Sequence, residues 1–203
     1  MIWRVLQLMR LMNKHTFNPE TVADFLNTPG AVAVIPTDTV YGLAARASDV
    51  LAVTNLYKLK NREHKPGTLI GANIKQLEDL GLKHRYLKAV EEYWPGAISV
   101  VIPCANPDLE YLHQSKNSLA VRIPKDDQLQ KLLASTGPLL TSSANNPGEP
   151  TANSIDQAMQ TFGDKIKLYV DGGDTTGNQP STLIRILDDE IEVLRKGAVT
   201  IDL

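Results

Sequence analysis

Four basic side chains fall within eight residues, directly after an apolar stretch with helical spacing, at Lys58, Lys60, Arg62 and Lys65. A charge run on a solvated helix face normally alternates in sign, whereas the only acid inside this cluster is Glu63. Pro66 and Gly67 then turn the chain into an apolar run. Cations gathered on a helix-to-strand connection are suited to binding a polyphosphate. The alternative, which this segment leaves open, is a solvated helix end whose Lys and Arg side chains complement the helix dipole.

A second group of polar side chains lies where predicted strands begin or end, and its members are Thr39, Arg122, Thr141, Ser143, Asn145 and Ser181. In open α/β sheets, ligands collect at the ends of strands because side chains and free backbone N–H groups converge there. One cleft is therefore expected to hold all of these residues. Taken singly, each has an ordinary explanation as a turn, a helix cap or a surface ion pair. Their joint occurrence favours a substrate site.

The elements that must position these residues alternate between helix and strand patterns. Helical spacing occurs at residues 19–27, 50–59, 74–80, 87–90, 129–133 and 155–162. Strand-like apolar runs occur at residues 31–35, 68–72, 98–102, 119–123, 139–142, 167–170, 182–187 and 191–194. The last two runs are joined by a short polar turn and form a predicted hairpin, so the sheet is mixed rather than purely parallel. The predicted fold class is α/β, with one twisted mixed sheet flanked by helices.

The chain of 203 residues is 42% apolar, which is enough for one sizeable core and a single domain. Its formal net charge of −2 argues against broad nucleic-acid binding, which usually needs a strongly basic surface. Cys104 is the only cysteine, so neither an internal disulfide nor a multi-cysteine metal cluster can form. The four histidines lack metal-ligand spacing, and surface positions are expected for them. These features indicate a reducing compartment, and a cytoplasmic location is predicted.

Residues 1–17 differ in character from the domain predicted for residues 18–203. Their apolar stretch is interrupted by Arg4 and Arg10 and is far shorter than a membrane span. No uninterrupted apolar core precedes a small-residue cleavage site, so a signal peptide is not expected. An N-terminal extension or an amphipathic helix is predicted, and the three methionines in this segment are alternative translation starts.

Six short motifs, in order along the chain, resemble those of the YrdC/TsaC family, the threonylcarbamoyl-AMP synthases. They are Pro-Thr-Asp-Thr-Val-Tyr-Gly-Leu at 36–43, Lys-Asn-Arg at 60–62, Tyr-Trp-Pro-Gly at 93–96, Ser-Leu-Ala-Val-Arg at 118–122, Ser-Ser-Ala-Asn at 142–145 and Arg-Lys-Gly at 195–197. The resemblance implies a YrdC-like catalytic domain at 18–203 with a substrate cleft and nucleotidyltransferase activity. The implied reaction joins L-threonine, bicarbonate and ATP into threonylcarbamoyl-AMP with release of pyrophosphate. That adenylate is the donor for threonylcarbamoyladenosine modification of tRNA.

The resemblance also implies a role for each motif residue. In the ATP site it places Lys60 and Arg62, as catalytic residues, with Ser118, Ser143, Asn145, Thr151 and Arg195. In the threonine site it places Thr39, Arg122, Thr141 and Ser181. Arg122 suits the α-carboxylate because a guanidinium forms two parallel hydrogen bonds that a lysine cannot reproduce. Mg²⁺ is implied by the triphosphate, and because phosphates and water supply most of its ligands, no protein metal ligand is predicted.

Two departures from the family pattern concern loops. Glu63 stands where the family usually has a proline after the arginine, and residues 146–148 replace a Ser-Gly pair. The departures leave open the route of the 62–68 loop and the contact made by Thr151.

The main alternative is a double-stranded RNA- or tRNA-binding YrdC-like module without synthase activity, with the basic runs 58–65 and 83–88 as its footprint. The negative net charge counts against it. A different carbamoyl-adenylate enzyme, such as a hydrogenase-maturation carbamoyltransferase, would need a much longer chain. The expected partners are small-molecule substrates and, by product hand-off, the downstream tRNA threonylcarbamoyl-transferase complex. Contact with tRNA or other RNA is expected to be weak, no membrane partner is expected, and the protein should be a monomer or a weak dimer.

Overall fold

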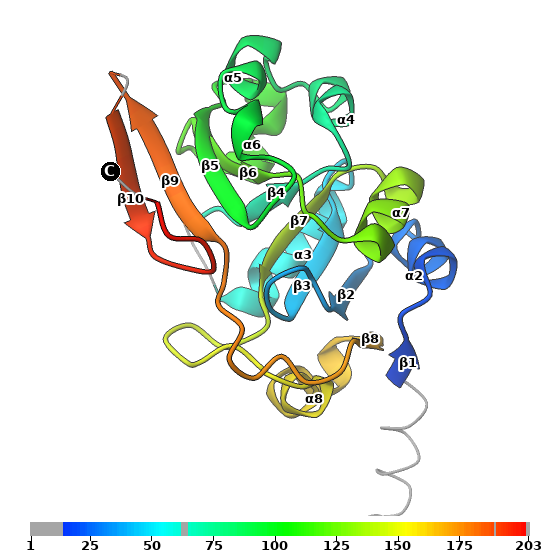
Figure 1. Cartoon of the computed structure of the whole chain (residues 1–203). Helices are drawn as coiled ribbons and strands as arrows, with labels where there is room; N and C mark the ends of the chain where they lie inside the picture. The colour runs from blue at the N-terminus through cyan, green and yellow to red at the C-terminus, as the bar shows by residue number, and fades with distance from the viewer. Residues whose placement is uncertain (1–13, 62–64, 189, 202–203) are drawn as a thin grey trace, which may run out of the picture.

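The computed structural model describes residues 14–61, 65–188 and 190–201, and one mixed sheet of ten strands runs through this part of the chain (Figure 1). The strands, in chain order, are β1 Lys14–Thr16, β2 Val32–Ile35, β3 Gly42–Arg46, β4 Thr68–Ile70, β5 Ile98–Pro103, β6 Ser118–Arg122, β7 Leu139–Ser143, β8 Leu168–Asp171, β9 Thr182–Leu187 and β10 Glu190–Arg195. Across the sheet their order is β1-β8-β2-β3-β7-β4-β6-β5-β9-β10. The predicted single α/β fold is confirmed.

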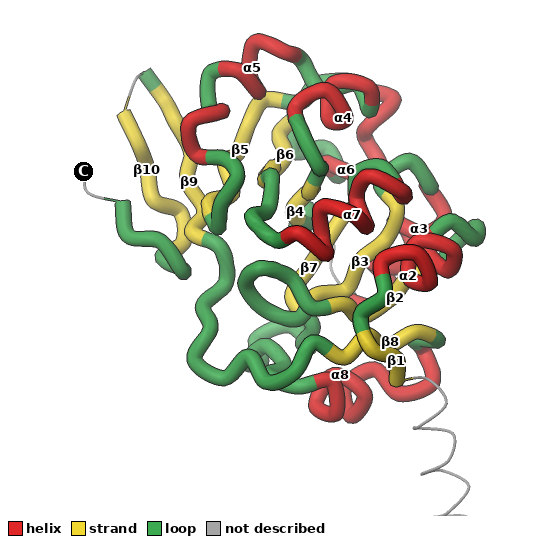
Figure 2. The backbone as a smooth tube through the Cα atoms, turned by 45° about the vertical axis from the view of Figure 1, so that its right-hand side comes forward, coloured by secondary structure: helices red, strands yellow, loops and turns green. Residues whose placement is uncertain are grey.

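Helices lie around this sheet (Figure 2). Those described are α2 Pro19–Leu26, α3 Val50–Lys60, α4 Ile74–Asp79, α5 His84–Lys88, α6 Glu110–His113, α7 Asp127–Thr136 and α8 Ile155–Phe162. Short 3₁₀ helices cover Glu91–Tyr93, Pro107–Leu109 and Gly163–Lys165. The longer helices follow the predicted apolar spacing. The single turn of α6 carries no such pattern and is not predicted from it.

Neighbouring strands form both parallel and antiparallel pairs, as the sequence predicts. The pairs β1–β8, β2–β8, β4–β6 and β5–β9 are parallel, and the other neighbouring pairs are antiparallel. β9 and β10 form the predicted C-terminal hairpin. Because β9 also pairs with β5, this hairpin is the edge of the main sheet (Figure 1). The start of β9 therefore lies at the end of the sheet where β6 reaches Arg122.

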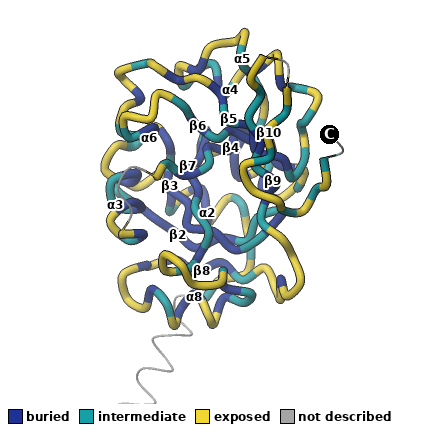
Figure 3. Tube along the Cα trace, turned by 90° about the vertical axis from the view of Figure 1, so that its left-hand side faces the viewer, coloured by how far each residue is buried: buried dark blue, intermediate teal, exposed yellow. Residues whose placement is uncertain are grey.

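Alternate residues of the strands face two separate hydrophobic cores. On one face, Val34 and Val121 belong to a large core that also includes residues of α3, α6 and α8. On the other face, Ala33, Ile35 and Leu139 pack with α2 and α7 in a small core. The central strands are accordingly buried along most of their length (Figure 3). The small core covers only part of its face of the sheet.

α3 carries Lys60 in its last turn. Asp49 caps the start of the helix, where its carboxylate accepts a hydrogen bond from the backbone N–H of Ala52 at 3.0 Å. The helix ends at Asn61, whose φ of 44° is in the left-handed region that terminates many helices. Lys60 lies one turn after the fully buried Leu56 and so on the same helix face. The packing of α3 therefore directs the Lys60 side chain toward the sheet.

Two strands differ from the prediction. β3, with the sequence Gly-Leu-Ala-Ala-Arg, consists mainly of small residues buried on both faces, and such a run lacks the alternation that marks a strand. β1 pairs in parallel with β8, so the sheet begins inside residues 1–17, which the sequence predicts to be an extension. The rest of that segment, residues 1–13, lies outside the described residues.

Candidate active site

The floor of the site is a row of small side chains on three neighbouring strands. Thr68 of β4 lies between Thr141 of β7 and Ala120 of β6, in register with both. The Thr141 hydroxyl donates a hydrogen bond to the backbone oxygen of Thr68 at 2.9 Å. Two residues further along, Ile70 and Leu139 belong to the small core under α2 and α7. α2 and α7 therefore do not cover the part of this sheet face that carries the small polar residues.

A cavity of about 150 Å³, called here the polar cleft, opens over this floor. It brings together six of the predicted site residues, which are Thr39, Arg122, Thr141, Ser143, Ser181 and Arg195. The volume is below the roughly 300–1,000 Å³ that is typical for drug-sized ligands. The polar cleft is thus closer in size to an amino acid than to a nucleotide.

A second cavity of about 270 Å³, called here the basic cavity, adjoins the first. Its lining residues are Lys60, Asn61, Lys65, Ser143, Asn145, Pro147 and Gly148. Ser143 lines both cavities. The single cleft expected from the sequence is therefore divided in two, with hydroxyls and arginines in one part and lysines in the other.

Arg122 brings a buried charge to the polar cleft. Its Nη1 donates a hydrogen bond to Oδ1 of Asp38 at 2.6 Å, and the two side chains are only 4% and 6% exposed. Burial lowers the pKa of Arg122, and the adjacent Asp38 carboxylate opposes this shift. Burial likewise raises the pKa of Asp38, against the influence of Arg122. Among the described residues, Arg122 Nε and Asp38 Oδ2 are buried without a hydrogen-bond partner. The contact with Asp38 uses one of the five N–H donors of the guanidinium, and Arg122 lines the cleft, so other donors remain for a ligand.

Two hydroxyl pairs line or support the polar cleft. The Thr37 hydroxyl donates to the backbone oxygen of Val40 at 2.7 Å, and it lies 3.0 Å from the hydroxyl of Thr39. The hydroxyls of Ser99 and Ser181 are 2.8 Å apart in a buried position. These bonds orient the hydroxyls of Thr39 and Ser181 within the cleft.

Arg195 reaches the polar cleft from the C-terminal hairpin. Its Nη2 donates to the backbone oxygen of Ser181 at 2.7 Å and to the Ser181 hydroxyl at 3.1 Å. Gly197 follows closely against the same segment, where a Cβ would come within 2.1 Å of the backbone oxygen of Pro180. This close approach holds the end of β10 beside the polar cleft. Arg195 does not line the basic cavity, and its predicted nucleotide contact stays a prediction.

Lys60 is buried, with 3% of its surface exposed. Its Nζ donates to the backbone oxygen of Ser143 at 2.8 Å, to Oδ1 of Asn145 at 2.9 Å and to the backbone oxygen of Asn145. The Ser143 hydroxyl donates to the same Oδ1 at 2.6 Å. The ammonium thus holds the segment that follows β7. This structural role adds to the phosphate-binding role that the sequence predicts for Lys60.

Three other predicted residues stand apart from these contacts. Arg62 lies outside the described residues. Ser118 is on the same face of β6 as Arg122, because alternate residues of a strand share a face, but it lines neither cavity. Thr151 also lines neither cavity. The predicted nucleotide contacts of these residues stay predictions.

Three further residues of the site are not singled out by the sequence: Asp38, Thr68 and Ser99. Asp38 has a signal that could have identified it, since it is the one acid in the motif that carries Thr39. Thr68 and Ser99 lie within strands, where nothing in the local pattern separates them from other strand residues. Their roles depend on which strands are neighbours.

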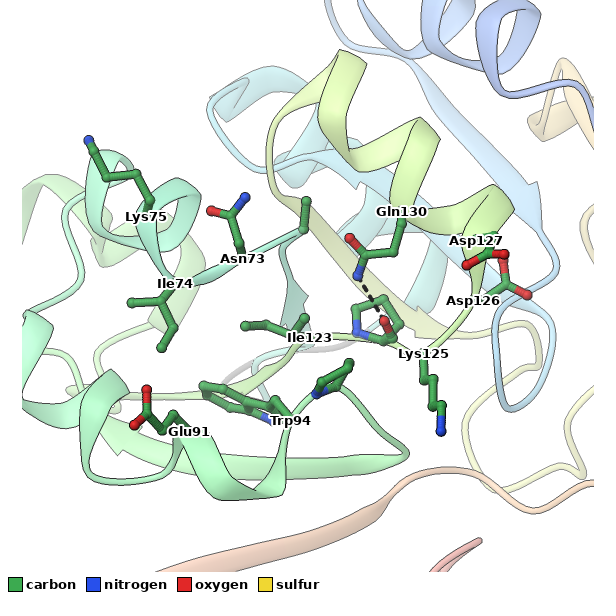
Figure 4. Close-up of a pocket in the computed structure, with 13 residues that line it drawn as sticks. Asn73, Ile74, Lys75, Glu91, Trp94, Ile123, Lys125, Asp126, Asp127 and Gln130 are labelled. Carbon is green, nitrogen blue, oxygen red and sulfur yellow. Dashed lines mark hydrogen bonds between the residues drawn. The ribbon is translucent and has the colours of Figure 1, made fainter.

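A larger cavity, of about 730 Å³, lies beside the segment that follows Arg122 (Figure 4). Its lining includes the apolar side chains of Ile74, Trp94 and Ile123 and the charged Lys125. The residues described around it include none of the predicted site residues. Size favours this cavity as a ligand site. The buried arginine and the oriented hydroxyls favour the polar cleft, and specific polar groups matter more than volume for a small polar substrate.

Comparison with known proteins decides the family. The family model Sua5_yciO_yrdC, described as "Telomere recombination", matches residues 26–197. This chain belongs to the Sua5/YciO/YrdC family. A family relative from Mycobacterium leprae is 32% identical over 179 residues, which cover 85% of this chain and 80% of the relative. The threonylcarbamoyl-AMP synthase of Bacillus subtilis is 31% identical over 174 residues, which cover 83% of this chain and 50% of the synthase. This chain therefore spans about half the length of that longer relative.

Solved structures of the Sua5/YciO/YrdC family share the fold. Pyrococcus abyssi Sua5 complexed with L-threonine matches with a TM-score of 0.78 and 29% identity, covering 91% of this chain and 56% of Sua5. E. coli YciO matches with a TM-score of 0.73 and 21% identity, covering 93% of this chain and 90% of YciO, and this likeness shows the fold alone. The family resemblance predicted from the motifs is confirmed.

Two further findings apply to the part of the chain that the structure describes. There is no group of three His, Cys, Asp or Glu side chains that could hold a metal ion. None of its helices is both long and apolar enough to cross a membrane. The cationic side chains that the structure does bring to the two cavities are Arg122, Arg195, Lys60 and Lys65.

Proposed function

We propose that this protein is a threonylcarbamoyl-AMP synthase, a nucleotidyltransferase that uses L-threonine, bicarbonate and ATP. The observation that carries the proposal is the junction at Ser143, where a cleft with a buried arginine adjoins a cavity with two lysines. An amino acid and a triphosphate need neighbouring sites of these two kinds. Two relatives support the proposal: a threonylcarbamoyl-AMP synthase from Bacillus subtilis and Pyrococcus abyssi Sua5, which is known in complex with L-threonine.

Threonine would occupy the polar cleft. Arg122 would bind its α-carboxylate through donors that the contact with Asp38 does not use. Thr39, Thr141 and Ser181 are buried hydroxyl residues of the same cleft and would engage the amine, the carbamate and the substrate hydroxyl. Because each already makes a hydrogen bond within the protein, little ordering is needed when the substrate binds.

ATP would lie along the basic cavity. Arg62 is the proposed direct phosphate ligand. Lys60, whose N–H donors hold Asn145 and Ser143 in position, would contribute its positive charge beside the phosphates. Ser143 faces both cavities, so it marks where the nucleotide meets the amino acid. The other residues proposed for the nucleotide, on the family resemblance, are Ser118, Thr151 and Arg195. Arg195 lines the polar cleft, so it would contact the nucleotide only where that cleft adjoins the basic cavity.

The chemistry suits such a site. The ammonium group of threonine first loses a proton, and the resulting amine combines with bicarbonate to give a carbamate and one water molecule. A carbamate oxygen then attacks the α-phosphorus of ATP, and the bond from that phosphorus to the bridging oxygen of pyrophosphate breaks. Neither step needs a side-chain nucleophile. Rate acceleration would come from alignment of the reactants and from cations near the phosphates.

Mg²⁺ is proposed to arrive with ATP. The described residues lack a carboxylate cluster, and Mg²⁺ at nucleotide sites commonly takes its ligands from phosphates and water with one or two side chains at most. The residues present therefore fit a metal held chiefly by the triphosphate. When bound, Mg²⁺ would neutralise part of the phosphate charge.

The remaining proposals concern the setting of the enzyme. We infer a cytoplasmic location, a monomer or weak dimer, and hand-off of the adenylate to a tRNA threonylcarbamoyl-transferase complex. No feature of the fold favours the RNA-binding module as the main function. Weak contact with RNA stays a prediction.

A pyrophosphate-release assay tests the function. ATP is supplied with threonine and bicarbonate, and each of the two co-substrates is then left out in turn. Release that requires both supports the proposal. Release that proceeds equally with ATP alone would identify an ATP pyrophosphohydrolase instead.

A further inference from the structure

We propose that Asp38 is a positioning residue, whose carboxylate holds the guanidinium of Arg122 so that Arg122 binds the carboxylate of the amino-acid substrate. The inference rests on the proposed function, because it assigns the substrate carboxylate to Arg122. Asp38 would not contact the substrate itself and would act only by positioning Arg122.

The geometry separates the roles of the two residues. Arg122 lines the polar cleft, and Asp38 does not. The contact between them, from Nη1 to Oδ1, is 2.6 Å long and almost completely buried. Asp38 also lies between Thr37 and Thr39, whose hydroxyls are 3.0 Å apart. One short turn therefore sets both the Arg122 guanidinium and the Thr39 hydroxyl.

The contact is through one nitrogen and one oxygen, although a guanidinium and a carboxylate can form two parallel bonds. Among the described residues, Arg122 Nε and Asp38 Oδ2 are both buried without a partner. A single-point contact leaves other donors of Arg122 for a second carboxylate.

The charge of Asp38 explains why Arg122 can be buried beside the cleft. A guanidinium with 4% of its side chain exposed is unfavourable without a compensating charge nearby. Asp38, which does not line the cleft, supplies that charge. The other acid that acts on Asp38 is Asp126, at the start of α7, and the backbone N–H of Lys125 also favours the Asp38 carboxylate. The substrate thus meets an arginine that is already oriented and neutralised, which lowers the ordering cost of binding.

Asp38→Asn tests the inference, since it keeps the size and removes the charge. Binding of L-threonine, of L-threoninamide and of ATP is measured by calorimetry on the full chain, and Asp127→Asn, which changes an exposed acid, is the matched control. Asp38→Asn should weaken threonine binding by about 10–100-fold, the scale found when a partner that orients a binding group is removed. Threoninamide, which has no carboxylate, and ATP should bind as they do to the wild-type protein.

The outcomes separate this inference from the proposed function. A wild-type protein that does not bind threonine would contradict the proposed function. A wild-type protein that binds threonine, together with an Asp38→Asn variant that binds it equally well or more tightly, would overturn the role of Asp38. An equal loss for threonine and threoninamide would also overturn it, because the effect would then be general to the cleft.

A second variant covers the case in which Asp38→Asn does not fold. Asp38→Glu keeps the negative charge in the same turn and should retain most of the preference for threonine over threoninamide. A folded Asp38→Glu protein without that preference would contradict the inference.

Discussion

The ammonium of Lys60 is hydrogen-bonded to the side-chain oxygen of Asn145, at 2.9 Å, across 85 positions of sequence. It also donates to the backbone oxygens of Asn145 and Ser143. A lysine has three N–H donors, and these contacts engage all of them. The end of α3 is thereby tied to the segment that follows β7, and both sides of this connection line the basic cavity.

Replacement of Lys60 should therefore affect stability as well as activity. Lys60→Met keeps the length of the side chain but removes the donor to the part-buried backbone oxygens of Ser143 and Asn145, while Oδ1 of Asn145 keeps the hydrogen bond from the Ser143 hydroxyl. We expect a loss of about 2–4 kcal/mol in the free energy of unfolding, since each buried unsatisfied group costs about 1–3 kcal/mol. Urea denaturation measures this free energy of unfolding, and Lys58→Met, which replaces an exposed lysine of the same helix, is the control. Equal urea midpoints for Lys60→Met and the wild-type protein would contradict the structural role.

Arg62 is expected to act on turnover alone. If it stabilises charge on the transferring phosphates, Arg62→Ala should lower the rate of pyrophosphate release by roughly 10²–10³-fold, the scale for loss of one preorganised charge stabiliser. The thermal unfolding midpoint should not change. Lys58→Ala removes a neighbouring charge and should retain near-normal turnover. Near-normal turnover by Arg62→Ala as well would remove Arg62 from the mechanism.

The hydroxyls of the polar cleft predict a substrate order. Adenylate formation should be fastest with threonine, slower with serine, and nearly absent with valine or 2-aminobutyrate. Serine keeps the hydroxyl and loses a methyl group, a difference of about 1–3 kcal/mol in a fitted pocket. Valine leaves buried polar groups unpaired, and discrimination against it should be larger. Rates are compared at saturating ATP and bicarbonate, and equal rates for threonine and valine would show that the hydroxyl is not recognised.

The lowered pKa of the Asp49 carboxyl predicts that the free energy of unfolding depends on pH. Burial acts to raise the pKa of its carboxyl, but hydrogen bonds from the backbone N–H groups of Gly30, Ala52 and Leu51 outweigh it, so the pKa is lowered from its usual 3.8. The pKa of Asp49 is lower in the folded than in the unfolded protein. The ionised carboxylate therefore stabilises the fold fully at pH values above the unfolded-state pKa, and this contribution is lost as the pH falls through the folded-state pKa. Asp49→Ala should cost about 0.5–2 kcal/mol near neutral pH, the range for loss of a helix N-cap.

The stability difference between wild type and Asp49→Ala is then measured by denaturation from neutral pH to below pH 3.8. It should shrink in the acid range. Asp24→Ala, an exposed acid within α2, is the control and should show little difference at any pH. A wild-type advantage that grows as the pH falls would have the wrong sign for this account.

Much of the fold follows from local patterns in the sequence. Apolar spacing identifies α3 and α8, and the closing hairpin follows from two strand patterns around a polar turn. β3 is missed because its residues are small and buried on both faces, so neither helical nor strand periodicity marks them. β1 is missed because its three residues are stabilised by pairing with β8, which comes more than 150 positions later.

The candidate site is predictable to the extent that its residues lie in short motifs. Arg122, Thr141 and Ser181 are identified from the sequence and meet in one cleft. The partnership of Arg122 with Asp38, and the burial of Lys60, depend on which strands and loops are neighbours across the sheet. Local sequence contains no such information, which is why a cluster of four cations predicts only phosphate binding for Lys60.

The central claim is that one active site joins three substrates into one adenylate. The most direct measurement is mass spectrometry of the nucleotide products after incubation with ATP, labelled threonine and labelled bicarbonate. A single AMP adduct that carries both labels should form, in the same amount as pyrophosphate. An adduct that carries the threonine label without the bicarbonate label would contradict it, because the enzyme would then be making a simple aminoacyl-adenylate.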